Sequence, residues 1–214
     1  MENTVEFKGV TKSFGEVIAV RDISFEIGRG QLVTLLGPSG CGKTTTLRLI
    51  AGLELVTEGK INISGKEVTH LSASDRDVSM VFQSYALFPH MTVMENVSYG
   101  LNMSRLQKNE VSEKAIEGLE LVGMSNFSNR LPSELSGGQQ QRVAVARALV
   151  LEPEVLLFDE PETGLDLEGF KSFVEILNLS TQMGKSVLIT THADLTKFKM
   201  EYTHYHLERG QLIP

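Results

Sequence analysis

Cysteine, tryptophan and long apolar segments are what this 214-residue sequence has least of. Cys41 is its single cysteine, and tryptophan is absent. One cysteine excludes an internal disulfide and any zinc cluster built on cysteines, so we expect the chain to work in a reducing cytoplasm. The apolar runs are short and broken by Gly, Asp or Lys. They fall well below the roughly 20 residues that a membrane-spanning helix needs.

Basic residues are also in the minority, with 20 Lys and Arg against 27 Asp and Glu, which gives a net charge of -7. Because nucleic acids and anionic lipids both attract basic surfaces, this balance argues against direct binding to either. Any membrane attachment should therefore run through a protein partner. The polar, acidic start of the chain does not resemble a secretory signal. The length and the 41% hydrophobic content predict one folded domain over residues 1–214.

Several short apolar stretches predict strands. Ile23, Phe25 and Ile27 alternate with polar residues, which is the period of a half-buried strand. Continuous apolar runs predict buried parallel strands at residues 32–36, 155–158 and 187–189. The pattern over residues 203–213 predicts a final hairpin.

Helical spacing of apolar residues follows most of these strands. The predicted helices cover residues 43–51, 110–121, 139–150 and 167–183. We interpret Asn96 and Gly100 as interruptions within the helical middle of the chain, which extends over about residues 84–135. Strands that alternate with helices predict an α/β fold with a mostly parallel sheet. We expect a catalytic core formed by about residues 1–83 and 137–214, and a helical subdomain inserted at about residues 84–136.

The strongest functional signal is a glycine-rich loop between the strand at 32–36 and the helix that begins at Lys43. It fits the phosphate-binding pattern G-x-x-x-x-G-K-[ST] with Gly37, Pro38, Ser39, Gly40, Cys41, Gly42, Lys43 and Thr44. The glycines let backbone N–H groups surround a β-phosphate, Lys43 can reach the β- and γ-phosphates, and the Thr44 hydroxyl can bind Mg²⁺. The positive end of the following helix points at the same anion. The strand and helix on either side disfavour the alternative of a glycine-rich turn with a chance lysine.

A second signal is the pair Asp159 and Glu160 at the end of the apolar run 155–158. Parallel α/β sheets bind ligands at the carboxyl ends of their strands. Asp159 would hold Mg²⁺ through a water, and Glu160 would orient and polarise the water that attacks the γ-phosphate. Taken alone, the pair is equally typical of a strand that meets a solvated turn, but the phosphate loop favours the catalytic interpretation.

A third segment indicates the family. It consists of Leu135, Ser136, Gly137, Gly138 and Gln139, continued by Gln140, Gln141 and Arg142. Ser136 is expected to cap a helix that starts near Gln139, and the two glycines expose N–H groups that make a second anion site. This segment resembles the signature sequence of ABC (ATP-binding cassette) ATPases, and the other motifs follow the order of that family along essentially the whole chain.

The resemblance implies a P-loop NTPase (RecA-like) core with an N-terminal antiparallel β subdomain and an inserted α-helical subdomain. It implies ATP and Mg²⁺ as ligands, ATP hydrolysis as the activity, and a head-to-tail dimer with a second ATP-binding subunit, either a copy or a paralogue. In such a dimer, Ser136, Gly137, Gly138 and Gln139 close over the nucleotide held by the other protomer.

Further site residues follow from the resemblance one position at a time. Phe14 matches the aromatic residue that stacks on adenine, with a core residue as the alternative. Gln83 matches the glutamine that contacts Mg²⁺ and the attacking water, and Asp166 matches the loop that contacts the opposite protomer. His192 matches the switch histidine at a strand end. The implied catalytic residues are Glu160, His192, Gln83 and Lys43; the Mg²⁺ ligands are Thr44, Gln83 and Asp159; Thr45 joins the residues that bind the nucleotide. Glu162 departs from the family, where relatives often have an apolar or small residue.

Residues 83–93 and 95–97 resemble those of bacterial import ATPases of the maltose, spermidine and ferric-iron group. In that group the segment receives a coupling helix of the membrane permease, and Leu87, Phe88 and Met91 could supply an apolar patch for it or pack inside the helical subdomain. The resemblance places the protein on the cytoplasmic face of the inner membrane. We expect no C-terminal regulatory domain, as in short thiamine-type relatives.

Two other classes of function stay open. An exporter or lipoprotein-release motor shares every catalytic residue, whereas a non-transport ABC ATPase of the DNA-repair or ribosome-associated kind usually has coiled-coil insertions, zinc cysteines or two cassettes. The transported substrate is not readable from the sequence. Alkylation of Cys41 is expected to block nucleotide entry. His204 and His206 share one face of a predicted strand, but without a third ligand we expect no metal besides Mg²⁺.

Overall fold

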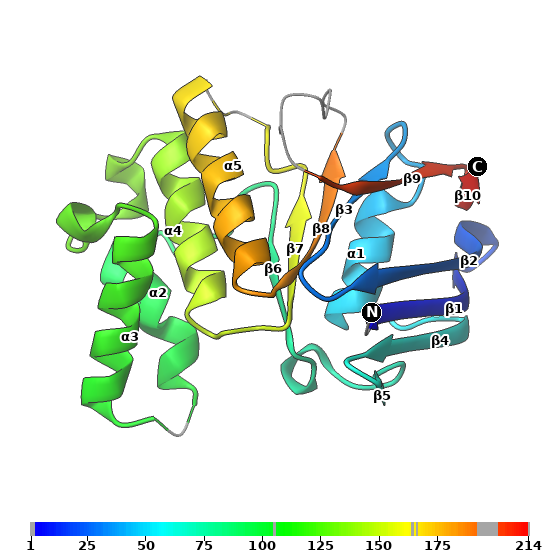
Figure 1. The fold of residues 1–214 in the computed structure, drawn as a ribbon, viewed down its shortest axis with the longest axis horizontal. Coiled ribbons are helices and arrows are strands. Elements are labelled where there is room, and N and C mark those ends of the chain that lie inside the picture. Colours follow the sequence, from blue (N-terminus) through cyan, green and yellow to red (C-terminus); the bar gives the residue numbers. More distant parts are fainter. Residues whose placement is uncertain (1–2, 105, 164, 166, 192–200, 214) are drawn as a thin grey trace. The chain divides into compact units, whose positions relative to one another are not determined.

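The computed structural model describes residues 3–104, 106–163, 165, 167–191 and 201–213. The backbone forms two compact units, which we call the core unit (residues 1–80, 154–161 and 177–214) and the helical unit (residues 81–153 and 162–176). Figure 1 shows the helices and strands, coloured from the N-terminus to the C-terminus. The sequence-based limits of the helical subdomain, about 84 and 136, stay a prediction.

The first sheet of the core unit is antiparallel, with the strand order β2-β1-β4-β5. Its strands are β1 (Asn3–Phe14), β2 (Val17–Gly28), β4 (Glu58–Ile63) and β5 (Lys66–Glu67). Ile23, Phe25 and Ile27 are buried and their neighbours Ser24 and Glu26 are exposed, so the predicted alternation is confirmed.

The second sheet is mostly parallel, with the order β10-β9-β3-β8-β7-β6. Its strands are β3 (Leu32–Leu36), β6 (Val78–Val81), β7 (Val155–Asp159), β8 (Ser186–Thr191), β9 (Thr203–Glu208) and β10 (Gln211–Ile213). Strand β3 pairs in parallel with β8 and β9, and β7 pairs in parallel with β8. The three predicted buried strands are therefore confirmed, as is the final hairpin of β9 and β10, which pair antiparallel.

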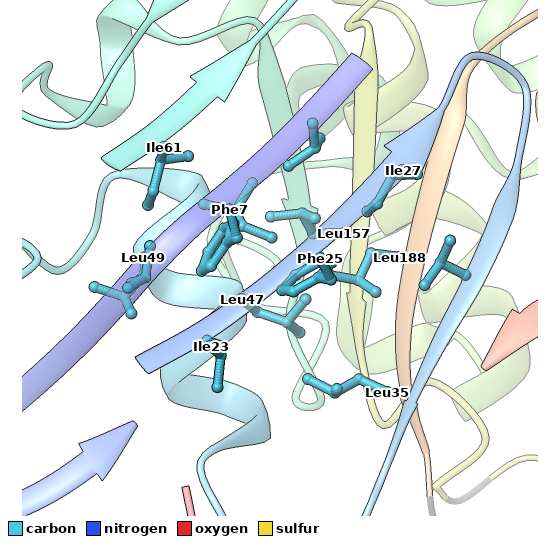
Figure 2. Close-up of a cluster of buried hydrophobic side chains, with 14 of the residues drawn as sticks. Phe7, Ile23, Phe25, Ile27, Leu35, Leu47, Leu49, Ile61, Leu157 and Leu188 are labelled. Atoms are coloured by element: carbon cyan, nitrogen blue, oxygen red, sulfur yellow. The ribbon is translucent and has the colours of Figure 1, made fainter. Parts of the chain in front are cut away.

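Apolar side chains from both sheets and from helix α1 (Lys43–Ala51) form the core, as Figure 2 shows. The rings of Phe7 and Phe25 stack with centroids 4.6 Å apart, and Leu47 of α1 is fully buried. Helix α1 ends where predicted, at Gly52, whose left-handed conformation lets its N–H bond back to the last turn.

Arg76 fixes the carboxyl end of α1, although only 6% of its surface is exposed. It follows the short 3₁₀ helix η1 (Ala73–Asp75). One guanidinium nitrogen, Nη1, donates to the carbonyl oxygens of Leu49 (2.6 Å) and Ile50 (3.0 Å). Nε and Nη2 donate to the Leu71 carbonyl, and Nη2 also reaches that of Thr69. Burial lowers the pKa of Arg76. The negative end of the helix dipole and these carbonyls compensate its charge.

We expect Arg76→Met to lower the free energy of unfolding by about 3 kcal/mol, because several buried carbonyls lose charged donors. For a chain of this size the melting temperature should fall by roughly 6–12 °C. Arg21→Met is the matched control, since Arg21 is an exposed arginine of the same unit. Equal melting temperatures for the Arg76 variant and the control, measured by calorimetry, would contradict the anchoring role.

The helical unit contains α2 (Val93–Asn102), α3 (Lys108–Leu121) and α4 (Gly137–Leu149), with the 3₁₀ turns η2 (Ser125–Phe127) and η3 (Pro132–Glu134). The last long helix is α5 (Leu167–Gln182). The Thr92 hydroxyl accepts from the Glu95 N–H, and the Glu95 carboxylate accepts from the Thr92 N–H. The Thr92 N–H, and after it the Thr92 hydroxyl, lower the pKa of Glu95 because both donate to its carboxylate. The reciprocal bonds define the start of α2.

The prediction that Asn96 and Gly100 interrupt this region is wrong, because both lie inside α2. The buried Asn96 amide accepts from the Phe88 N–H and donates to the carbonyls of Phe88 and Met91. Its polar groups thus stabilise the preceding loop. A side chain at Gly100 would press against Leu151, so the glycine permits close packing. Sequence pattern alone does not reveal the contact between Gly100 and Leu151, which lie about 50 residues apart in the chain.

Candidate active site at the carboxyl ends of β3 and β7

The phosphate loop, residues 37–44, connects β3 to α1 within the core unit. A side chain at Gly42 (φ +110°) would come within 2.5 Å of the Ala19 carbonyl oxygen, and one at Gly37 would collide with the Leu207 carbonyl. The loop is therefore packed against β2 and β9, and the Gly210 N–H donates to the Cys41 carbonyl at 3.0 Å. Pro38, Ser39 and Gly40 form its exposed tip, and Gly40 has no protein atom within 4 Å of where a Cβ would lie. The backbone at Gly40 is thus open to a ligand.

Lys43 begins α1, and only 4% of its surface is exposed. Its ammonium group donates to the carbonyls of Gly37 (2.8 Å) and Pro38 (3.2 Å), so the loop curls around the cation. The first turn of α1 contains no acidic residue and no side-chain cap at Gly42. The cation and the positive helix end therefore favour an anion at the same place.

Asp159 ends β7, beside the phosphate loop, and is buried with 8% of its surface exposed. Its Oδ1 atom accepts from the Thr44 hydroxyl at 3.0 Å and from the Thr190 hydroxyl at 2.8 Å. A carboxylate and a hydroxyl within hydrogen-bond distance provide the hard oxygen donors that Mg²⁺ prefers. Thr44 and Asp159 therefore fit the predicted ion. Thr190 was not among the predicted site residues, although its place at the polar end of a buried strand was a usable signal.

Glu160 has an unusual backbone conformation, with φ +46° and Pro161 next in the chain. Its N–H donates to both the carbonyl and the hydroxyl of Thr190, each at 3.0 Å. A non-glycine residue in this region costs about 1–3 kcal/mol, and such strain is concentrated at functional sites. The carboxylate Oε1 lies 3.8 Å from the Lys43 ammonium. The structure thus brings together Lys43, Thr44, Asp159 and Glu160, four of the predicted site residues.

Other predicted residues of the core unit lie as follows. Phe14 is 47% exposed, which rules out the alternative that it is a core residue, and the Lys12 ammonium lies 4.5 Å from its ring centroid. Thr45 is half-buried in α1. Cys41 is 4% exposed and packs in the core, so its alkylation requires the loop to open first. His192 lies outside the described residues.

The signature segment lies in the helical unit and begins α4 at Gly137, two residues before the predicted start. Ser136 caps the helix as expected: its hydroxyl accepts from the Gln139 N–H at 3.3 Å, and the Gln139 amide oxygen accepts from the Ser136 N–H. Gly137 and Gly138 leave the first two positions of the helix without side chains. The local geometry is that of a helix start open to an anion.

The segment after Gln83, itself exposed, is held in an unusual conformation. Tyr85 (φ +59°) and Ala86 (φ +48°) are both left-handed. Arg147 of α4 donates to their carbonyls at 2.9 and 2.8 Å, and burial lowers its pKa. The Tyr85 hydroxyl donates to the Thr163 carbonyl, and burial raises the pKa of Tyr85.

Leu87, Phe88 and Met91 follow this strained pair and are all half-buried. The Phe88 ring lies 4.6 Å from that of Tyr99, so part of the expected apolar patch packs within the helical unit. Glu162 is also partly buried, and Asp166 is outside the described residues. Within the described ranges, no helix combines the length and apolar character needed to cross a bilayer.

Comparisons with known proteins agree with this arrangement. The model of the ABC transporter family matches residues 20–163. The chain is 60% identical to the Fe(3+) ions import ATP-binding protein FbpC of Brucella abortus (strain 2308), over 88% of this chain and 54% of that protein. It is 48% identical to the FbpC of Escherichia coli O157:H7, over 99% of this chain and 61% of that protein. The chain thus spans about half the length of the curated relatives it matches.

Solved structures confirm the predicted fold. One is the dimeric structure of a post-hydrolysis state of the ATP-binding cassette MJ0796, bound to ADP and Pi. Its chain is 32% identical in sequence to this one and superposes with a TM-score of 0.87, over 98% of this chain and 97% of that chain. The ADP conformation of the cassette MJ1267 is 26% identical with a TM-score of 0.88, over 100% and 90% of the two chains.

Proposed function

The chain belongs to the ABC transporter family, and from this premise we propose that it binds and hydrolyses ATP to power a bacterial importer. The proposal rests on one observation: the side chains of Lys43, Thr44, Asp159 and Glu160 lie close together at the carboxyl ends of β3 and β7. Together they provide a phosphate cradle, an oxygen site for Mg²⁺ and a carboxylate beside both.

Each side chain has a separate task in this proposal. Lys43 binds the β- and γ-phosphates, and Thr44 and Asp159 hold the ion. When bound, Mg²⁺ neutralises charge on the phosphate oxygens. Glu160 orients and polarises the attacking water, and its strained backbone, bonded to Thr190, fixes the direction of the carboxylate. Gln83 and His192 are proposed to complete the water and γ-phosphate contacts, and Phe14 to stack on adenine.

A second ATP-binding subunit would complete the site. The capped, glycine-rich start of α4 supports the role of Ser136, Gly137, Gly138 and Gln139 as an anion site for the nucleotide of the other protomer. The dimeric state of the MJ0796 cassette supports a dimer here. Closure on ATP and reopening after hydrolysis would supply the motion that drives transport.

The partner on the membrane side is proposed to be a separate permease, which places the subunit at the cytoplasmic face of the cell membrane. Residues 85–91 are a suitable docking segment, because Arg147 and Asn96 fix their backbone. The names of the relatives make Fe³⁺ the first substrate to test, and they favour import over export.

The test is to express the tagged Glu160→Gln variant in its native host, solubilise the membranes with ATP present, and identify what co-purifies. We expect a multi-span permease, and the Lys43→Ala variant serves as a control that cannot load ATP. Recovery of soluble proteins or nucleic acid alone would contradict the transport function and favour a non-transport ATPase.

A further inference from the structure

Strand β9 directs its side chains alternately to two different surroundings. Leu207 is buried, and Tyr205 packs toward Phe25, with ring centroids 5.3 Å apart, while its hydroxyl donates to the Glu26 carbonyl. His204 and His206 lie on the other face of the strand and are both exposed. Within the described part of the chain, neither imidazole makes a hydrogen bond.

Strand β9, which carries this histidine pair, is paired with a neighbouring strand on each of its two edges. His204 and His206 are opposite Thr34 and Leu36 of β3 in the parallel ladder, and His206 is also opposite Ile213 of β10. The imidazole ring centroids are 6.0 Å apart, with the rings at 84°. The two neighbouring imidazoles therefore stand on a rigid strand, and they can move only by rotation about their own side-chain bonds.

This spacing is close to that of a metal chelate. A metal–nitrogen bond of about 2.0–2.1 Å puts each ring centroid about 3.2 Å from the ion, so two rings at a tetrahedral angle are about 5 Å apart. The observed pair needs to close by about 1 Å, which a small rotation of exposed side chains provides. Among the described residues, no cluster of three or more His, Cys, Asp or Glu side chains could hold an ion, so water would fill the other positions.

Strand β9 also touches the phosphate loop. The Leu207 carbonyl lies where a side chain at Gly37 would be, and a Leu207 methyl would be 3.3 Å from a side chain at Gly42. In addition, Gly210 in the β9–β10 turn bonds to the Cys41 carbonyl. An ion bound at His206 would therefore lie on a strand that packs directly against the nucleotide site.

In contrast to the expectation from the sequence, we propose that His204 and His206 chelate one divalent transition-metal ion of the Cu²⁺, Ni²⁺ or Zn²⁺ type without a third protein ligand, and that its binding is linked to nucleotide binding. Imidazole nitrogens select these ions over Mg²⁺ and Ca²⁺, which prefer oxygen. The site is distinct from Thr44 and Asp159, and it does not depend on the proposed transport function.

The binding test is calorimetric titration of the full chain with Ni²⁺ in excess Mg²⁺, which occupies oxygen sites. We expect one ion per chain, and about a tenfold or greater loss of affinity in both His204→Asn and His206→Asn, because each variant loses one arm of the chelate. The exposed His70 and His90 supply matched controls, His70→Asn and His90→Asn. Wild-type affinity in either β9 variant, or equal losses in the controls, would overturn the site.

A second readout uses the unsubstituted protein. Trace Cu²⁺ should broaden the imidazole proton resonances of His204 and His206 together, and before those of His70 and His90. Broadening of one without the other would also overturn the chelate.

The linkage is tested by measuring the affinity for a fluorescent nucleotide with and without Ni²⁺. We expect a change that disappears in His206→Asn, with the reciprocal change in metal affinity. An unchanged nucleotide affinity would overturn the linkage.

Discussion

Replacing Glu160 by glutamine should reduce steady-state ATP hydrolysis by about 10²–10⁴-fold while leaving ATP affinity nearly unchanged. The carboxylate is the proposed group that polarises the attacking water, and the amide cannot accept its proton. Glutamine has nearly the same shape, so it should keep the left-handed backbone at this position and the two bonds from its N–H to Thr190. Phosphate release and equilibrium nucleotide binding are measured on the same preparation.

The Glu160→Gln variant should also accumulate as a closed dimer with ATP, because reopening needs hydrolysis. Size-exclusion chromatography with light scattering reports this directly. The control is Glu67→Gln, which removes an exposed carboxylate of the same unit. Unchanged turnover in Glu160→Gln would remove Glu160 from its role, and a monomer at saturating ATP would contradict the trapped state.

Segments with one dominant local signal could be predicted from the sequence. The apolar run at residues 32–36, the glycines around Lys43 and the stop at Gly52 gave β3, the phosphate loop and α1 with almost the observed limits. These features depend on burial and backbone freedom over a few residues, so they are legible in a single sequence.

Features held by distant partners could not be predicted. Nothing near Arg76 in the sequence indicates that its guanidinium bonds to carbonyls of α1, more than 20 residues earlier. Likewise, local preferences oppose the left-handed Tyr85 and Ala86, and the two bonds from Arg147, about 60 residues later, stabilise them. Gly100 was misinterpreted for the same reason, because the side chain packed against it, Leu151, lies about 50 residues later in the chain.

Lys43→Ala should weaken ATP binding by about 10²-fold or more. The ammonium is the proposed donor to two phosphate groups, and each charged hydrogen bond contributes about 1.5–3 kcal/mol. In the structure the same ammonium holds the Gly37 and Pro38 carbonyls, so the variant also loses an interaction that shapes the loop. Equilibrium titration with a fluorescent nucleotide measures the affinity.

Thermal unfolding separates lost binding from lost folding. ATP with Mg²⁺ should raise the melting temperature of the unsubstituted protein, because a ligand that binds only the folded state stabilises it, and this increase should disappear in Lys43→Ala. Lys60→Ala removes an exposed ammonium of the same unit and should behave like the unsubstituted protein. If Lys43→Ala melts cooperatively and still gains the full ATP-dependent stabilisation, the phosphates are not held by this lysine, and the proposed assignment of the whole phosphate loop fails with it.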